Sequence, residues 1–348
     1  MILNCVIICN DTLAKGQSHI SKGCPVSHQN PTPVCAFAIS HDGIPRSIPL
    51  PDDLSDIAAS DSYIWLHFDV NDPALEGWLT DKVPHTIATA LLQSETRPRC
   101  DRIEEGLILN LRGVNMNPGA SADDMVSVRL WVTQGLIISA RIRKIWAVDA
   151  IRQQMDAGRA SATVAAFLTE LAYGLTKRIE KVSLGLVEDT DELEEHALAP
   201  SGSLARDLAG LRQSVIKLRR FVRPQSEAIA ELSSGAVWPL DVHCASLLSE
   251  TSNMTVRTVE ELDSTSDRLQ AIQEHLDVLH ASALGRNSYV LSVVAAIFLP
   301  LGFLTGLFGI NVGGMPGVEA AHGFWIVTGG SILVGFALFF VFRFLKWL

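Results

Sequence analysis

The chain has 348 residues, of which 48% are hydrophobic, and a formal net charge of −10 at pH 7. The negative charge argues against nucleic acid as a partner, because phosphates would repel it, and towards cations. The six cysteines have no paired spacing and no exported context, so we interpret them as reduced thiols. We find no nucleophile–base set, phosphate loop or paired catalytic carboxylate motif, so we do not expect an enzyme.

Residues 1–32 are expected to form an irregular tail, because glycine and proline interrupt every periodic pattern in it. The opening apolar run is short and no basic residue precedes it, so it is a poor signal peptide. The tail contains five potential metal ligands: Cys5, Cys9, Cys24, His19 and His28. Their spacings match no familiar zinc knuckle, so a loose tail is favoured over a metal site.

Residues 33–160 mix strand and helix patterns, which indicates an α+β domain. Strands are expected at 34–39, 63–68, 107–111, 125–132 and 136–142. A helix is expected to start at Asn71-Asp72-Pro73, where a capping side chain precedes a proline, and another at 84–92. Thr133-Gln134-Gly135 is a hairpin signal, so the sheet is at least partly antiparallel.

Beyond this domain the pattern becomes wholly helical. Residues 161–238 are expected to form a helical hairpin, and residues 239–288 a stalk helix. Apolar residues keep one face in each segment, in steps of three, four or seven. They are Leu171, Leu175, Val182, Leu186 and Leu193, then Leu204, Leu208, Leu211, Val215, Leu218 and Val222, then Leu262, Leu269, Ile272, Leu276, Leu279 and Ala283. No proline lies between Pro239 and Pro300, so a single helix of about 60 to 70 residues should run into the next segment.

Residues 289–311 are predicted to form a transmembrane helix, because about 20 uncharged residues suffice to cross a bilayer. This segment ends on Gly309-Ile310-Asn311. An external loop (312–322), a second uncharged span (323–342) and a cytoplasmic end (343–348) are expected to follow. The lipid bilayer is therefore a predicted partner of the C-terminal sixth of the chain.

The basic residues around the spans predict the orientation. Arg286 precedes the first span, Arg343 and Lys346 follow the second, and the loop between them has no Lys or Arg. By the positive-inside bias, both termini and the acidic body lie in the cytoplasm of a multi-pass inner-membrane protein.

Neither span contains Asp, Glu, His, Lys or Arg, which favours a water-filled path for an ion that keeps its hydration shell. One hairpin cannot enclose such a path, so several copies around an axis are required. We expect one face to line it: Gly285, Ser288, Ser292, Ala295, Leu299, Gly302 and Gly306. Leu299 would form an apolar constriction. Close helix packing through Gly302 and Gly306 is the alternative.

The segment from Pro300 to Asn311, with the Gly313-Gly314-Met315-Pro316-Gly317 loop, resembles the CorA superfamily of divalent-cation transporters. That superfamily has Gly-Met-Asn at the end of its first span, and here Ile310 stands in place of Met. This departure is similar to the ZntB zinc-transporter branch, as are Glu95-Thr96-Arg97-Pro98-Arg99 and the terminal Lys346-Trp347-Leu348. The resemblance extends from about Pro33 to Leu348.

The resemblance implies a funnel-shaped homopentamer with a cytoplasmic αβα domain, a long stalk helix and a pore lined by the first span. It implies that Gly309, Ile310 and Asn311 form the outer mouth. An amide suits that place, because its carbonyl accepts hydrogen bonds from the ion's water molecules without trapping the ion. The alternative is that Asn311 only caps the helix. Ile310 favours zinc or related transition ions over magnesium.

Further cation contacts are expected outside the spans. In the loop, Glu319 and His322 could recruit cations, or they could be ordinary solvated residues. In the stalk, Glu274 and Asp277 lie three residues apart at the inner mouth, and Glu274 with His275 could bind a regulatory metal. The other acidic residues of the stalk are by default a solvated face.

We therefore expect a homopentameric transporter that takes divalent cations, Zn²⁺ first, into the cytoplasm and needs no cofactor. Whether protons are coupled is left open, because neither span offers an ionisable group to carry them. A Mg²⁺/Co²⁺ channel of the CorA type is the alternative within transport. A membrane-tethered metal sensor or scaffold is the alternative from another class.

Overall fold

The computed structural model describes residues 30–54, 61–103, 106–197, 204–309, 317 and 320–344. The chain divides into two compact units. The first comprises Met1–Gly113, Val126–Ala172 and Glu231–Leu248, and the second comprises Val114–Met125, Tyr173–Ala230 and Ser249–Leu348. The potential metal ligands of the N-terminal tail lie outside the described residues, so a metal site there stays a hypothesis.

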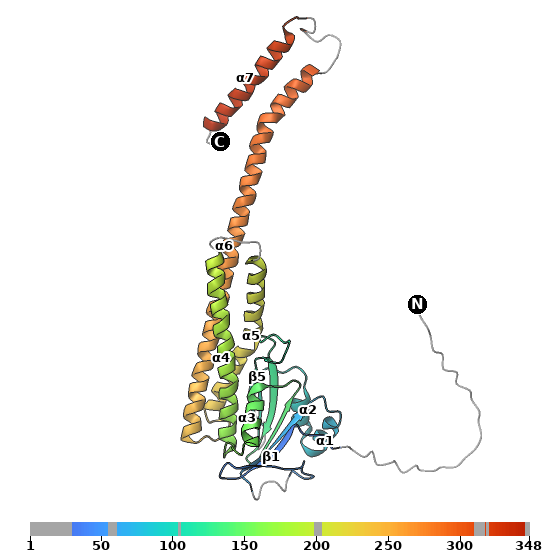
Figure 1. The fold of residues 1–348 in the computed structure, drawn as a ribbon, viewed down its shortest axis with the longest axis vertical. Helices are drawn as coiled ribbons and strands as arrows, with labels where there is room; N and C mark the ends of the chain where they lie inside the picture. Colours follow the sequence, from blue (N-terminus) through green and yellow to red (C-terminus); the bar gives the residue numbers. More distant parts are fainter. Residues whose placement is uncertain are drawn as a thin grey trace, which may run out of the picture. The chain divides into compact units, whose positions relative to one another are not determined.

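The first unit is built on a seven-stranded sheet with the strand order β2-β1-β3-β7-β6-β5-β4 (Figure 1). The strands are β1 (Cys35–Ile39), β2 (Pro45–Ser47), β3 (Tyr63–Asp69), β4 (Arg99–Ile103), β5 (Gly106–Gly113), β6 (Val126–Val132) and β7 (Leu136–Arg141). Only β3 and β7 pair in parallel; every other neighbouring pair is antiparallel. The predicted mixed sheet is confirmed, and so is the β6–β7 hairpin.

Two helices cover one face of this sheet. They are α1 (Leu75–Lys82) and α2 (His85–Leu92), and their apolar residues share a core cluster with Ile64, Leu66 and Ile108. The predicted start of α1 is two residues early. The Asp72 carboxylate accepts the backbone N–H of Ala74 in the turn before the helix, and Ala74 is the N-cap.

On the other face lie α3 (Trp146–Asp156) and the first turns of α4 (Val164–Ala197) (Figure 1). The Phe167 ring of α4 contacts the rings of Tyr63 and Trp65, with centroids 6.2 and 5.1 Å apart. These side chains alternate along β3 with Ile64 and Leu66, which point to the opposite face. The unit is therefore an αβα sandwich, as the family resemblance implied.

The second unit contains the rest of α4, with α5 (Leu204–Ser233), α6 (Val242–Gly309) and α7 (Gly323–Phe344). In this unit α4, α5 and α6 run side by side (Figure 1) and bury a common seam that includes Leu208, Val215, Leu262 and Leu269. Burial of one apolar stripe per helix is what stabilises such long amphipathic helices. The heptad prediction is confirmed for these residues.

The single long helix is also confirmed, since α6 has 68 residues and continues through Pro300. The buried seam, however, ends at Leu276. Leu279 and Ala283, which were predicted to extend it, are exposed. In Figure 1, α6 runs on beyond the ends of α4 and α5, so these two helices do not cover Leu279 and Ala283.

Candidate ion pathway

Helices α6 and α7 are the two described helices long and apolar enough to cross a membrane. Within α6, residues that are half-buried lie on one face: Val293, Ala296, Ile297, Pro300, Leu301 and Leu304. This face meets α7, because a Cβ atom built on Gly335 would lie 3.7 Å from Cδ1 of Leu301. One copy of the chain therefore covers only one stripe of its first span.

The predicted pore-lining residues lie on a different face of α6, and α7 does not cover it. All of them are exposed in the single chain: Gly285, Ser288, Ser292, Ala295, Leu299, Gly302 and Gly306. With 100° per residue, the middle of this stripe lies roughly 140° around the helix from the middle of the half-buried stripe. The small and polar face is thus free to meet other copies of the chain or water.

The two glycines of this face do not pack against α7. A Cβ atom built on Gly302 or Gly306 would meet no atom within 4 Å. Close packing through these glycines within one chain is therefore not found. Packing between copies and lining of a shared path both remain compatible with this geometry.

The hydroxyl groups on α6 are turned towards its own backbone. Ser292 Oγ donates to the Ser288 carbonyl oxygen (2.9 Å), and Thr305 Oγ1 donates to the Leu301 carbonyl oxygen (3.0 Å). Each hydroxyl proton is thereby used, while the oxygen keeps lone pairs that accept further hydrogen bonds. Water molecules bound to a cation point their hydrogens outward, so such acceptors suit a hydrated cation.

At the end of α6 away from the stalk, Gly309 is the last described residue of the helix and is exposed. Ile310, Asn311 and Glu319 lie outside the described residues, so their predicted roles stay hypotheses. His322 is exposed and sits at the start of α7, where its carbonyl oxygen accepts the N–H of Ile326 (3.1 Å). Its imidazole ring is accessible, as cation recruitment would require.

On the stalk part of α6, Glu274, His275 and Asp277 are all exposed. Glu274 accepts a hydrogen bond from Gln270 (3.0 Å), and Asp277 accepts one from Gln273 (2.9 Å). Within the described part of one chain, no three His, Cys, Asp or Glu residues come together as a metal site. A regulatory metal at this point would need ligands from more than one copy.

Many acidic residues of the stalk are paired with arginines, several of which lie on α5. Asp263 of α6 forms ion pairs with Arg219 and Arg223 of α5. Arg268 of α6 forms ion pairs with Asp191 and Glu194 of α4. The hydrogen bond from Arg268 lowers the pKa of Glu194, and the acidic partners raise the pKa of Arg268. Arg219 and Arg223 lie on α5, so the sequence alone could not show that they pair with Asp263 of α6.

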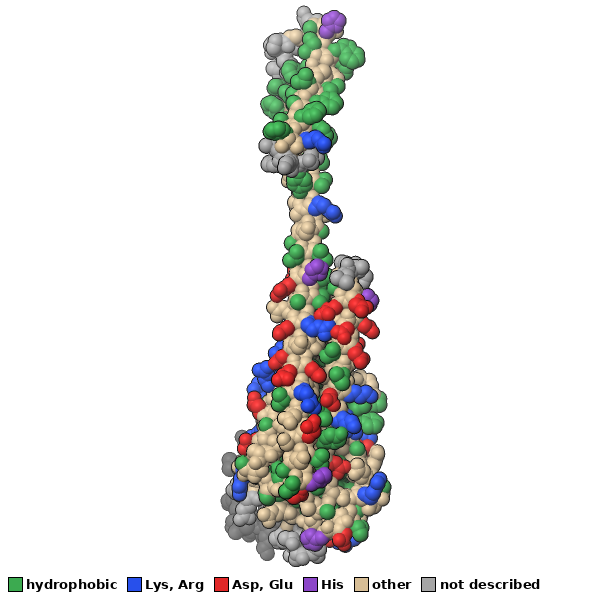
Figure 2. All heavy atoms as spheres, turned by 90° about the vertical axis from the view of Figure 1, so that its left-hand side faces the viewer, with side chains coloured by type: hydrophobic (Ala, Val, Ile, Leu, Met, Phe, Trp, Pro, Cys, Tyr) green, Lys and Arg blue, Asp and Glu red, His purple; other side chains and the backbone are tan. Residues whose placement is uncertain are grey.

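Figure 2 shows the acidic side chains gathered over the stalk helices, with none on the described parts of the membrane helices in that view. Within the described parts of α6 and α7, the charged residues lie before Tyr289 and at Arg343. The spans themselves present only apolar, glycine and hydroxyl groups, which agrees with a path that does not strip the ion of its water.

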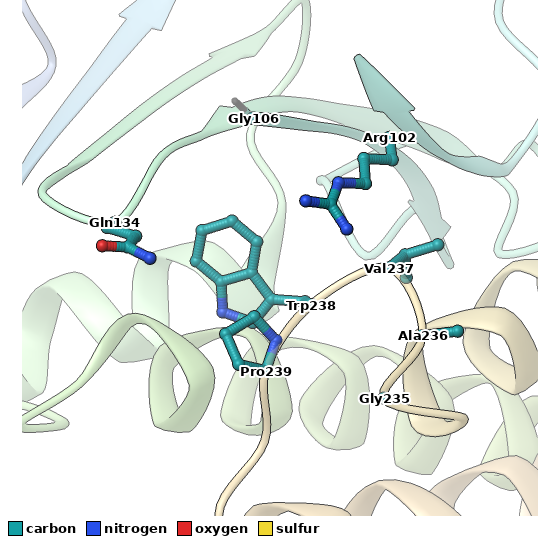
Figure 3. Close-up of a pocket in the computed structure, with 8 residues that line it drawn as sticks. All are labelled: Arg102, Gly106, Gln134, Gly235, Ala236, Val237, Trp238 and Pro239. Atoms are coloured by element: carbon teal, nitrogen blue, oxygen red, sulfur yellow. The ribbon is translucent and has the colours of Figure 1, made fainter. Parts of the chain in front are cut away.

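The first unit contains a pocket of about 230 Å³ beside the link between α5 and α6 (Figure 3). The Arg102 guanidinium, the Gln134 amide and the Trp238 ring lie around it. None of its lining residues is Asp, Glu, His or Cys. The pocket therefore offers no anionic side chain, and the Arg102 guanidinium at its wall would repel a cation.

The chain thus combines an αβα domain, a helix of 68 residues and two helices long and apolar enough to cross a membrane. The family model "CorA-like Mg2+ transporter protein" matches residues 60–343. The chain belongs to this family, as its residues at the end of the first span indicated.

Named relatives agree with that assignment. The divalent cation transporter CmaX of Pseudomonas aeruginosa is 35% identical over 292 residues, which are 82% of this chain and 87% of that protein. The zinc transport protein ZntB of Pectobacterium atrosepticum is 34% identical over 276 residues, 78% of this chain and 83% of that protein. The predicted resemblance to the ZntB-like branch is confirmed.

Solved structures support the fold. The structure of full-length CmaX superposes with a TM-score of 0.75 at 32% identity, covering 92% of this chain and 100% of that one. The CorA magnesium transporter of Methanocaldococcus jannaschii gives a TM-score of 0.71 at 14% identity, covering 89% of this chain and 98% of that one. The second likeness concerns the fold alone.

Proposed function

We propose that this protein carries divalent cations, Zn²⁺ in preference to Mg²⁺, across the inner membrane through a path shared by five copies. Both termini lie in the cytoplasm. The observation that carries the proposal is the uncovered face of α6. A continuous stripe of seven uncharged residues runs along α6 from Gly285 to Gly306. All seven are exposed in the single chain.

The named residues would act in sequence along this path. Glu319 and His322 recruit cations at the outer loop, and Gly309, Ile310 and Asn311 form the mouth. The α6 stripe lines the path, with Leu299 as its apolar constriction. Glu274 and Asp277 attract the ion at the inner mouth, and His275 beside them completes a regulatory metal site with groups of a neighbouring copy.

Two features support zinc as the preferred ion. Ile310 departs from the Gly-Met-Asn signature, and the relatives named as zinc transport proteins share a third of their residues with this chain. The family description names Mg²⁺, so a Mg²⁺/Co²⁺ channel is the second candidate. A membrane potential of 100 mV supplies about 4.6 kcal/mol to a dication, so uptake needs no other energy source.

The test is flux into liposomes that contain the full-length protein and a trapped metal indicator. Zn²⁺ should enter faster than Mg²⁺, Co²⁺ or Ni²⁺ and should compete with them. Asn311→Ala should abolish entry, which a tethered sensor would not require. Faster Mg²⁺ than Zn²⁺ entry would favour the second candidate, and flux unaffected by Asn311→Ala would refute the outer-mouth assignment.

The inner mouth and proton coupling are tested in the same vesicles. Changing Glu274 and Asp277 together to Gln and Asn should slow Zn²⁺ entry, and unchanged flux would refute their role. Flux measured with and without a pH gradient, at fixed membrane potential, decides whether protons move with the metal. Mass measurement of the intact complex gives the copy number, and any value other than five would refute the pentamer.

A further inference from the structure

The end of the membrane hairpin next to the stalk is positively charged. Arg286 lies three residues before the first span, and Arg343 lies in the last turn of α7. Neither of them forms an ion pair with any residue that the structure describes. After Asp277 the sequence contains one acidic residue, Glu319, in the loop at the opposite end of the hairpin. Each copy therefore carries two uncompensated guanidinium groups at one membrane surface.

Arg286 points away from the proposed path. It precedes Ser288 by two residues, which places it roughly 160° around the helix from that pore-lining side chain. Val293 and Pro300 follow it at steps of seven and are half-buried on the face that α7 approaches. The guanidinium group thus lies on the α7 side of α6, where headgroups rather than the axis would meet it.

Arg343 borders an apolar hollow on α7. This hollow has a volume of about 630 Å³ and is lined by Phe340, Val341, Arg343 and Phe344. The three apolar side chains are 64%, 50% and 89% exposed in the single chain. An apolar wall with one cation at its rim is the complement of a lipid, whose acyl chain and phosphate are joined in the same way.

We propose that Arg286 and Arg343 each bind the headgroup of an anionic phospholipid, and that the acyl chain of the lipid at Arg343 lies against Phe340, Val341 and Phe344. A guanidinium group recognises a phosphate through paired hydrogen bonds, and an anionic lipid such as phosphatidylglycerol also supplies the missing negative charge. A second copy of the chain seated in the hollow is the competing occupant.

Such a lipid would matter for transport. Ten guanidinium groups would surround the inner end of a path shared by five copies, and their field would oppose the exit of a cation. Bound lipid phosphates cancel that field. This consequence depends on the proposed function, whereas the lipid site itself does not.

Lipid binding is tested first, without any metal. The full-length protein is placed in bilayer discs that contain phosphatidylglycerol and phosphatidylcholine, and the lipids retained after extraction are counted by mass spectrometry of the intact complex. The wild type should retain phosphatidylglycerol selectively. Changing Arg286 and Arg343 together to Gln should lower that selectivity roughly thirtyfold, since each contributes about a factor of five near an anionic surface. Arg159→Gln, an exposed arginine of the first unit, is the matched control.

Flux then separates this proposal from the proposed function. In phosphatidylcholine alone the wild type should move Zn²⁺ several-fold more slowly than with phosphatidylglycerol, while the double variant should be equally slow in both. Selective retention without any flux would refute the transport function and leave the lipid site standing. The lipid site would be overturned if the wild type retained both lipids equally, or if the double variant retained phosphatidylglycerol as selectively as the wild type. A cross-link from Val341 to a second copy, with no lipid retained, would also overturn it.

Discussion

The two halves of α6 carry similar apolar side chains, which are buried in the stalk half and exposed in the membrane half. In the stalk, Leu262, Leu269 and Leu276 are at most 5% exposed, because α4 and α5 cover them. In the membrane half, Leu291, Phe298 and Leu299 are 67% to 73% exposed in the single chain. The stalk is thus a protein interior completed within one copy, whereas one copy leaves most of the membrane half uncovered.

The hydroxyl groups show the same contrast. In the stalk, Thr258 Oγ1 donates to the Met254 carbonyl oxygen (3.0 Å) and is buried. In the membrane half, Ser292 Oγ makes the same bond to Ser288 but is exposed. A hydroxyl bonded to its own helix serves packing where it is buried, and it serves as an acceptor for water where it is open.

The largest expected effect concerns the stalk. Leu269→Ala should lower the free energy of unfolding by about 2 to 5 kcal/mol, because it leaves a cavity in a closed core. Leu279→Ala is the matched control, and it should change that free energy by less than about 1 kcal/mol, since Leu279 is 37% exposed beyond the end of the seam. Both values are measured by denaturant unfolding of the purified full-length protein.

An equal effect at both positions would show that the seam continues to Leu279. In that case other copies of the chain, rather than α4 and α5, would cover the upper stalk. The change from a closed core to an open surface along α6 would then begin at the membrane and not at Leu276.

The next effect concerns the membrane half. Gly302→Leu should leave the stability of the protein unchanged, because a Cβ atom there meets nothing within 4 Å. In an assembled ring the leucine would project into the path and slow Zn²⁺ entry by about tenfold or more, which corresponds to about 1.4 kcal/mol of added barrier. Liposome flux measures this.

Gly329→Leu is the matched control for that substitution. Gly329 also has open space around its Cβ position, but it lies on the face of α7 away from α6. Flux should be retained in this variant. If Gly329→Leu blocked flux and Gly302→Leu did not, α7 rather than α6 would line the path.

Patterns that repeat along a helix made most of this fold predictable from the sequence. The stalk seam, both spans and the β6–β7 hairpin follow from apolar periodicity and turn residues. The edge strands β2 and β4 were missed, because one has three residues and the other has a single buried residue, Cys100, so neither shows a strand pattern. These two segments are strands because they pair with β1 and β5, and this pairing depends on the tertiary structure rather than on the local sequence.

The candidate site was predictable to a lesser degree. Helical spacing identified the small and polar stripe of α6, because spacing alone decides which residues share a face. It could not show that α7 covers a different face, since this depends on how two helices pack. Nor could it pair Asp263 with Arg219 and Arg223, which lie 40 or more residues away on α5.

The smallest expected effect concerns charge in the stalk. Arg268 donates to both carboxylate oxygens of Glu194, at 2.8 and 2.7 Å, and also contacts Asp191. The pair is partly exposed, so Arg268→Gln should lower the free energy of unfolding by about 1 kcal/mol or less at neutral pH. Arg257→Gln, which removes a longer contact of 3.3 Å to the exposed Glu250, is the matched control and should have no measurable effect.

The pH dependence shows whether the effect of Arg268→Gln on the free energy of unfolding comes from the ion pair with Glu194. Arg268 lowers the pKa of Glu194 in the folded protein, so the contribution is present above the usual pKa of a glutamate. It is lost as the pH falls through the lowered value, where Glu194 becomes protonated. The difference in unfolding free energy between the wild type and Arg268→Gln should therefore shrink on acidification and also with added salt. A difference that stayed constant instead would mean that Arg268 stabilises the stalk through packing of its apolar stem rather than through its charge.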